Sequence, residues 1–213
     1  MKKNKSINFK LYLITDRKLI AESCFLTSAV RQALKGGVKA VQLREKDLGE
    51  RELLKLAYKM RDLTKKYEAS LFINDRLDIA LAVGADGVHL TQESIPADAV
   101  KKAVKGKLLI GVSTHSLKEA GKAEKAGADF ITFGPVCRTP SKLRYGKPVG
   151  VDNLKKACIK VNMPVFAIGG VKIRRINELK KTGTHGVAVI SEILGSQDIE
   201  TKTREIVNLL EDG

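Results

Sequence analysis

Short apolar runs rich in β-branched residues alternate along the chain with longer segments of helical periodicity. Each run has the length of a buried strand, and Gly or Pro residues separate it from the segment that follows. The clearest helix is Arg51–Tyr67, with one apolar face, and a Ser116–Glu119 capping box begins another at Leu117–Ala126. The predicted strands are Leu11–Asp16, Ala40–Glu45, Leu71–Asp75, Gly87–Leu90, Leu109–Ser113, Phe130–Pro135, Val165–Gly170 and Gly186–Ser191.

Several joints between a helix and the next strand repeat a glycine-containing phrase. The phrases are GGVKAVQL from Gly36, VGADGVHL from Val83, KAGADFITF from Lys125 and KTGTHGVAVI from Lys181. A glycine can end each helix in a left-handed conformation before the chain turns into a buried parallel strand. Eight strand–helix units without a linker predict a single-domain (β/α)8 TIM barrel over residues 1–213, with residues 1–9 as a flexible basic extension. An open doubly wound sheet is the alternative, but no glycine-rich dinucleotide turn follows the first strand.

Composition and cysteine usage narrow the classes of protein. Of the 213 residues, 43% are hydrophobic and 30% are charged, as is typical of a globular protein. No apolar run is long enough to span a membrane, and the N-terminal segment lacks the apolar stretch of a secretory signal. Cys24, Cys137 and Cys158 form no CxxC pair, which excludes a disulfide framework or a zinc site. We therefore expect a cytoplasmic protein with no membrane partner.

The excess of basic residues indicates anionic partners. Lys and Arg number 39 against 24 Asp and Glu, which gives a net charge of +15. There is no Trp, only 5% of the residues are aromatic, and no nucleic-acid-binding motif occurs. We therefore expect small phosphorylated substrates and no nucleic acid. The sequence leaves open whether copies of the chain form a homo-oligomer.

The active site of such a barrel lies at the carboxyl ends of its strands, so the polar residues that close each apolar run are the candidates. Gln42, Arg44 and Lys46 alternate after the second strand, as convergence on one anion requires. The alternative is that Arg44 and Lys46 pair with acids elsewhere on the rim. Asp75 could hold Mg²⁺ against a diphosphate or cap the helix that starts near Asp78, and the spacing does not decide between these roles.

A phosphate site is predicted where the seventh and eighth strands end. Gly169 and Gly170 let backbone N–H groups approach a ligand, and Ser191 begins a short helix whose N–H groups complete the cradle. The alternative is that the two glycines only form a tight turn. The long irregular loop from Gly134 to Gly150 predicts a lid. Side chains of this loop offer hydroxyl and ammonium groups to a phosphorylated ligand: Thr139, Ser141 and Lys142.

Taken together, the motifs QLREK, INDR, GADGVHL, GVSTHS, TPSK, IGG and VIS resemble the thiamine-phosphate synthase (thiamine phosphate pyrophosphorylase) family and the related thiazole tautomerases. The resemblance covers nearly the whole chain, with the motifs in order. It implies a (β/α)8 barrel and a transferase that uses Mg²⁺. Such an enzyme couples 4-amino-5-hydroxymethyl-2-methylpyrimidine diphosphate to a thiazole phosphate, and it releases pyrophosphate and thiamine phosphate.

The resemblance also carries roles over to individual positions. Asp75 becomes a Mg²⁺ ligand, and Ser94 stands where these synthases usually have a second metal-binding aspartate. The catalytic groups are those that stabilise the leaving diphosphate: Arg44, Lys46, Ser113 and Lys142. The residues implied for the pyrimidine diphosphate are Gln42, Arg44, Lys46, Asn74, Ser113 and Lys142. Those implied for the thiazole phosphate are Thr139, Ser141, Gly170, Ile190 and Ser191.

Two alternative functions follow from the same resemblance. A thiazole tautomerase would keep the barrel and the thiazole phosphate site, and would use His115 after the fifth strand to move a proton. A non-catalytic protein would bind thiazole phosphate or thiamine phosphate without turnover. Lys46, Asn74, Asp75 and Lys142 favour the synthase, because a tautomerase has no evident need to keep them together.

The other reactive side chains are interpreted as structural. His89 lies inside the fourth strand and His185 lies in the joint before the eighth, where packing or surface roles are commoner than catalysis. Cys137 lies in the predicted lid, with no histidine at a spacing that would activate a thiol nucleophile. We therefore expect none of the three to take part in the chemistry.

Overall fold

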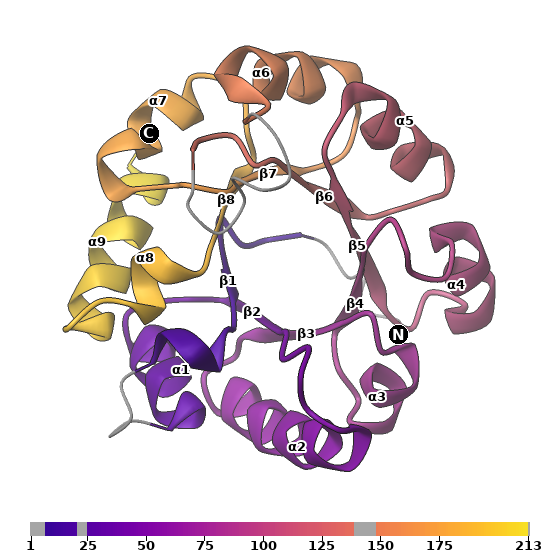
Figure 1. Ribbon diagram of the computed structural model, residues 1–213, viewed down its shortest axis with the longest axis vertical. Helices are drawn as coiled ribbons and strands as arrows, with labels where there is room; N and C mark the ends of the chain where they lie inside the picture. The colour runs from indigo at the N-terminus through magenta and orange to yellow at the C-terminus, as the bar shows by residue number, and fades with distance from the viewer. Residues whose placement is uncertain (1–6, 21–24, 139–147, 213) are drawn as a thin grey trace.

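The computed structural model describes residues 7–20, 25–138 and 148–212. Parallel strands close into a barrel in sequence order, and helices surround them as an outer ring (Figure 1). The predicted (β/α)8 barrel is confirmed and the open doubly wound sheet is wrong, because β1 pairs with both β2 and β8. The strands are β1 Leu11–Ile14, β2 Ala40–Leu43, β3 Ser70–Asn74, β4 Gly87–Leu90, β5 Leu109–Thr114, β6 Phe130–Phe133, β7 Val165–Ile168 and β8 Gly186–Val189.

The predicted helices are present, and α5 begins with the predicted cap in a modified form. The Ser116 hydroxyl accepts a hydrogen bond from the Glu119 N–H at 3.2 Å, whereas the Glu119 carboxylate reaches past the cap to the His115 N–H at 2.8 Å. In the ranges that the structure describes, no helix combines the length and the apolar composition that a membrane crossing requires. The helices are α1 Leu26–Lys35, α2 Glu50–Lys66, α3 Leu77–Ala82, α4 Ala97–Val104, α5 Leu117–Lys125, α6 Gly150–Lys160, α7 Ile176–Lys180, α8 Ser191–Leu194 and α9 Ile199–Glu211, with 3₁₀ turns η1 Arg17–Leu19 and η3 Ile173–Arg175.

The repeated joints before the strands combine a backbone role with a side-chain role. One glycine in each joint has a positive φ, from 61° at Gly84 to 105° at Gly37, which confirms the predicted left-handed ends of the helices. In the two GAD copies, the Asp86 and Asp129 carboxylates accept hydrogen bonds from N–H groups of the neighbouring strand at 2.9 and 2.7 Å. The aspartates therefore tie adjacent strands together at the amino-terminal end of the barrel.

Aromatic rings fill the barrel interior near the amino-terminal ends of the strands. Phe9 is 2% exposed, and the segment before β1 lies across the interior of the ring of strands in Figure 1. The prediction of a flexible extension is therefore wrong at Phe9, because its ring closes this end of the core; residues 1–6 lie outside the described ranges. Its ring centroid lies 5.2–5.9 Å from those of its neighbours Tyr12, Phe72, Phe130 and Phe166.

Candidate active site

An amide pair lines the barrel interior above the aromatic layer. Gln42 of β2 is 1% exposed, and its Nε2 donates a hydrogen bond to Oδ1 of Asn74, the last residue of β3, at 3.2 Å. Side chains two residues apart on a strand share a face, and Ala40 and Phe72 belong to the interior core. Gln42 and Asn74 therefore both point inward, and the structure brings these two predicted site residues together.

Ser113 of β5 belongs to a second interior polar group. Its Oγ lies 3.0 Å from Nε2 of His89 and 3.5 Å from Oγ1 of Thr132, while the Tyr12 hydroxyl lies 3.4 Å from Nδ1 of His89. Complete burial lowers the pKa of His89 to about 3, and the charge of Arg44 acts in the same direction. His89 is therefore a neutral imidazole beneath the site, in contact with a predicted site residue.

Two acidic residues after β2 face the loop that follows β1. The buried Glu45 carboxylate accepts hydrogen bonds from the Thr15 hydroxyl at 2.7 Å and from the Arg17 N–H at 3.2 Å. Asp47 accepts two hydrogen bonds from the Arg17 guanidinium, at 2.6 and 3.1 Å, and forms an ion pair with Lys18 at 3.0 Å. Hydrogen bonds from Lys18 and Arg17 lower the pKa of Asp47 to about 2, so its carboxylate is ionised at neutral pH.

Two cations alternate with these acids along the chain. Arg44 is half-buried and Lys46 is exposed, and neither forms an ion pair with any residue that the structure describes. The alternative that they pair with acids elsewhere on the rim is therefore wrong for the described residues. Both positive charges are available to an anion, because the acids beside them in sequence pair with the β1 loop.

Asp75 follows β3 in an unusual backbone conformation. Its φ is 65°, which is uncommon for residues other than glycine, and its N–H donates a hydrogen bond to the His89 carbonyl at 2.8 Å. The side chain is exposed, and within the described ranges its carboxylate accepts no hydrogen bond and forms no ion pair. The helix-cap alternative is wrong, because α3 follows Arg76 and its N-cap makes no side-chain hydrogen bond.

Ser94 makes its hydrogen bonds within the turn after β4. Its Oγ accepts from the Thr91 N–H at 2.8 Å and lies 3.0 Å from the Thr91 hydroxyl. Among the described residues, no group of three or more His, Cys, Asp or Glu side chains could hold a metal ion. Of the two positions implied for the metal, Asp75 carries a carboxylate and Ser94 does not. These two positions fit a Mg²⁺ ion bound by one carboxylate, with the other positions taken by substrate oxygens and water.

The glycines after β7 pack against the loop after β6. Gly169 and Gly170 have φ of 91° and 66°, and a Cβ atom on Gly170 would lie 2.7 Å from the Arg138 carbonyl oxygen. The Cys137 N–H also donates to the Gly169 carbonyl at 2.9 Å. Close packing against the loop after β6 is therefore enough to explain why glycine stands in this tight turn. The phosphate site at these glycines stays a prediction.

The other half of the predicted cradle is α8, which begins directly after β8. Its N-cap, Ile190, makes no side-chain hydrogen bond, and the N–H groups of a first helical turn have no helical partner. The Glu192 carboxylate accepts from the Ile173 N–H at 3.0 Å, which ties α8 to the segment after β7. The described residues implied for the thiazole phosphate thus lie at two neighbouring strand ends: Gly170, Ile190 and Ser191.

Part of the predicted site falls outside the described residues. Thr139, Ser141 and Lys142 lie in the range 139–147, so their contacts and the lid stay predictions.

His115 is exposed after β5, and its Nδ1 donates a hydrogen bond to the Gly134 carbonyl oxygen at 2.6 Å. In the neutral ring, Nε2 is then the acceptor nitrogen.

Burial shifts the pKa of two further reactive side chains, Cys137 and His185. It raises the pKa of the Cys137 thiol, and a buried, protonated thiol is a poor nucleophile. It lowers the pKa of the half-buried His185, whose ring centroid lies 5.3 Å from that of Phe166. Neither group lies among the described residues implied for the two substrates.

Comparison with known proteins identifies the family. Residues 11–193 match the family model described as thiamine monophosphate synthase, and this range includes all the strands of the barrel. The chain belongs to the thiamine monophosphate synthase family. The predicted family is therefore confirmed, and the family assignment makes the chain a transferase of the thiamine-phosphate diphosphorylase type.

Relatives of this thiamine monophosphate synthase family member match it over nearly their whole length. The putative thiamine-phosphate synthase of Geobacter sulfurreducens is 50% identical over 204 residues, which cover 96% of this chain and 95% of the relative. The thiamine-phosphate synthase of Pyrococcus furiosus is 42% identical over 203 residues, 95% of each chain. The solved structure of thiamine phosphate pyrophosphorylase from Pyrococcus furiosus matches with a TM-score of 0.87 and 41% identity, over 96% of each chain. These matches favour the synthase over the tautomerase.

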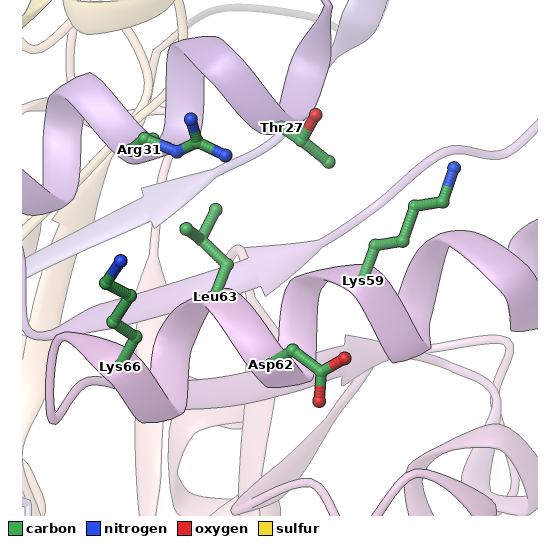
Figure 2. Close-up of a pocket in the computed structure, with 6 residues that line it drawn as sticks. All are labelled: Thr27, Arg31, Lys59, Asp62, Leu63 and Lys66. Atoms are coloured by element: carbon green, nitrogen blue, oxygen red, sulfur yellow. The ribbon is translucent and has the colours of Figure 1, made fainter.

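A basic cavity lies apart from the strand-end site of this family member, between α1 and α2 on the outside of the barrel (Figure 2). Its volume is about 360 Å³. Figure 2 shows its basic side chains on either side of Leu63, with Asp62 turned away from Arg31. The cavity does not open at the carboxyl ends of the strands, so we do not assign the substrates to it. Its lining residues are Thr27, Arg31, Lys59, Asp62, Leu63 and Lys66.

Proposed function

We propose that this chain is a thiamine-phosphate synthase that joins 4-amino-5-hydroxymethyl-2-methylpyrimidine diphosphate to a thiazole phosphate and releases pyrophosphate. The observation that carries the proposal is the separation of charges after β2. Glu45 and Asp47 are bound to the β1 loop, whereas Arg44 and Lys46 form no ion pair among the described residues. Unpaired cations at the end of a barrel strand suit a diphosphate, which carries several negative charges.

The pyrimidine diphosphate would bind over β2, β3 and β5. The amides of Gln42 and Asn74 supply donors and acceptors inside the barrel for the pyrimidine ring, and the Ser113 hydroxyl lies on a neighbouring part of the interior. Arg44 and Lys46 would bind the diphosphate at the rim, with Lys142 from the predicted lid. Gln42 is buried, Asn74, Ser113 and Arg44 are half-buried, and Lys46 is exposed, so the pyrimidine ring would lie inside the barrel and the charged tail of the substrate at its rim.

Asp75 would hold Mg²⁺ at the rim. Its carboxylate is exposed and, among the described residues, accepts no hydrogen bond and forms no ion pair, which leaves it available to a cation. Mg²⁺ bound there supplies positive charge that neutralises the departing diphosphate. Ser94 contributes no carboxylate, so the remaining ligands come from the diphosphate and water.

The thiazole phosphate would bind at the ends of β7 and β8. Gly170, Ile190 and Ser191 offer backbone N–H groups at a turn and at the start of α8, which suit a phosphate. Thr139 and Ser141 would add hydroxyl groups from the predicted lid. In the closed barrel only β1 lies between β8 and β2, so the two substrates would meet over the barrel mouth.

The reaction needs positioning and charge rather than a protein nucleophile. The bond between the pyrimidine methylene carbon and the diphosphate oxygen breaks, and its electron pair leaves with the diphosphate. The resulting cation is stabilised by the aminopyrimidine ring, and the thiazole nitrogen attacks it to form the new carbon–nitrogen bond. Arg44, Lys46 and the Ser113 hydroxyl stabilise the charge on the leaving group, and the barrel mouth aligns the two rings.

The test is direct synthesis of thiamine phosphate. The purified chain is incubated with both phosphorylated precursors, with Mg²⁺ or with EDTA, and the product is oxidised to its fluorescent thiochrome derivative. We expect product only with Mg²⁺. Lys46→Ala should lower kcat/KM by about tenfold or more, since it removes a charge-assisted contact. The control Lys59→Ala removes an exposed lysine of α2 and should leave the rate unchanged.

Absence of product from a folded chain would overturn the proposal. In that case, binding of thiazole phosphate followed by isomerisation of a thiazole carboxylate phosphate, lost in His115→Gln, would establish the tautomerase. Binding without either reaction would establish the non-catalytic protein. Equal product with Mg²⁺ and with EDTA would overturn the role of Asp75 while leaving the synthase in place.

A further inference from the structure

One buried hydroxyl bonds to two consecutive residues of the charged segment after β2. Thr15 directly follows β1 and is 0% exposed. Its Oγ1 accepts a hydrogen bond from the Arg44 N–H at 2.9 Å and donates its proton to Oε1 of Glu45 at 2.7 Å. Its own N–H donates to the Gln42 carbonyl at 2.9 Å. Thr15 therefore fixes the backbone of one predicted substrate-binding residue and the carboxylate of the next residue along the chain.

The second oxygen of the Glu45 carboxylate continues the network into the β1 loop. Oε2 of Glu45 accepts from the Arg17 N–H at 3.2 Å and from the Arg17 guanidinium at 3.3 Å. The same guanidinium binds both oxygens of Asp47, and the pKa of Arg17 is raised, chiefly by that bond. The side chain of Glu45 is only 2% exposed, so nothing but the protein can balance its charge. Arg17 supplies that balance.

The network decides which charges face the substrate. Glu45 stands between Arg44 and Lys46 in the sequence. Its bonds to Thr15 and Arg17 hold it on the β1 side. The positive charge of Arg44 acts on the interior of the barrel instead, as its effect on the pKa of His89 shows.

We propose that Thr15, Glu45 and Arg17 form a positioning clamp for the diphosphate-binding cations Arg44 and Lys46. The inference rests on the proposed function and deepens it. Thr15 and Glu45 are not available to the substrate: Thr15 is fully buried, and both oxygens of Glu45 bond to protein groups. They hold the segment after β2 in place and keep its acids from neutralising its cations.

The test compares Thr15→Val with Thr15→Ser. Valine keeps the shape of threonine and removes both hydrogen bonds of the hydroxyl, whereas serine keeps the hydroxyl. We expect Thr15→Val to raise KM for the pyrimidine diphosphate about tenfold, since a hydrogen bond to a charged group is worth at least that factor. The KM for the thiazole phosphate should stay within about twofold, because that substrate binds at β7 and β8. Thr15→Ser should restore the wild-type value.

If Thr15 had only a structural role, Thr15→Val would change the two KM values and the melting temperature in a different way. An equal rise of both KM values, or a lower melting temperature with both KM values unchanged, would overturn the clamp.

If Thr15→Val does not fold, Arg17→Leu replaces it, because the Arg17 side chain is partly exposed at 37%. This variant removes the guanidinium from both acids, while Glu45 keeps its hydrogen bond from Thr15 and Asp47 keeps its ion pair with Lys18. KM for the pyrimidine diphosphate should therefore rise. Adding Asp47→Asn should recover part of the loss, and no recovery would contradict the charge argument.

The failure of the clamp and the failure of the proposed function are distinguishable. Binding of inorganic diphosphate is measured by calorimetry in the presence of Mg²⁺, without any turnover. If the wild-type chain makes no thiamine phosphate but binds diphosphate about tenfold more tightly than Thr15→Val, the clamp stands and the synthase does not. Equal diphosphate affinity in the two proteins would overturn the clamp even if the wild-type chain is an active synthase.

Discussion

The buried His89 makes the stability of the barrel depend on pH in a predictable direction. Folding lowers its pKa from an ordinary value of 6.5 to about 3, chiefly through complete burial. Below pH 6.5 the unfolded chain therefore takes up a proton that the folded chain does not bind. The free energy of unfolding contributed by this group is intact above that pH, and it falls as the pH is lowered from 6.5 towards 3.

The size of the effect follows from the separation of the two pKa values. Each pH unit below the unfolded pKa costs about 1.4 kcal/mol, so lowering the pH from 7 to 4.5 should remove about 2 to 3 kcal/mol through His89 alone. The perturbation that isolates this part is His89→Gln. Its amide stays neutral and can still donate a hydrogen bond to the Ser113 hydroxyl, which now lies 3.0 Å from the imidazole.

The assay is urea denaturation followed by circular dichroism at pH 7, 6, 5 and about 4.5, where carboxylates are still largely ionised. His89→Gln should lose about 2 to 3 kcal/mol less than the wild type over this range. The matched control His115→Gln removes an exposed histidine, keeps His89 and should retain the wild-type pH dependence. Equal pH dependence in His89→Gln and the wild type would refute the reasoning, since it would mean that folding does not exclude the proton.

Further predictions concern the core, the thiazole phosphate site and the metal. Phe9→Ala should lower the free energy of unfolding by about 3–5 kcal/mol in urea denaturation, because it empties the aromatic layer, while the control at the 83% exposed Phe25, Phe25→Ala, should have little effect. A loss at Phe9 no larger than at Phe25 would contradict the packing argument. Gly170→Ala places a Cβ atom 2.7 Å from the Arg138 carbonyl oxygen and should raise KM for the thiazole phosphate about tenfold, with KM for the pyrimidine diphosphate unchanged. The reverse pattern would exclude the thiazole phosphate from this turn. Ser94→Asp adds a second carboxylate at the rim and should tighten Mg²⁺ binding in the presence of inorganic diphosphate by about tenfold in calorimetry, and unchanged binding would show that residue 94 does not face the metal.

The hydrophobic pattern was sufficient to predict the barrel. Parallel strands of a barrel are covered on both faces, so they appear as short continuous apolar runs, and all eight predicted runs are strands of the closed sheet. The glycines of the repeated joints predicted the left-handed helix ends, because a backbone with positive φ favours glycine. The strand-end rule then indicated Gln42, Asn74 and Ser113, which do line the interior polar groups.

The sequence pattern could not predict which polar groups bond to one another across the barrel. Thr15 and Glu45 are 30 residues apart, and Tyr12 and His89 are 77 residues apart. No pattern in the sequence indicated that Phe9 closes the core, since one aromatic residue in a basic segment has no periodicity.

The sequence by itself determined the alternation of strands and helices, the left-handed joints and the polar residues that close the strands, because each of these depends on neighbours within a few positions. The tertiary structure of the barrel decided the rest. It brought the end of β1 beside the end of β2, so that Thr15 and Arg17 bind the acids and leave Arg44 and Lys46 unpaired among the described residues. It also enclosed His89 and so made it neutral, because removal from water disfavours the charged imidazole.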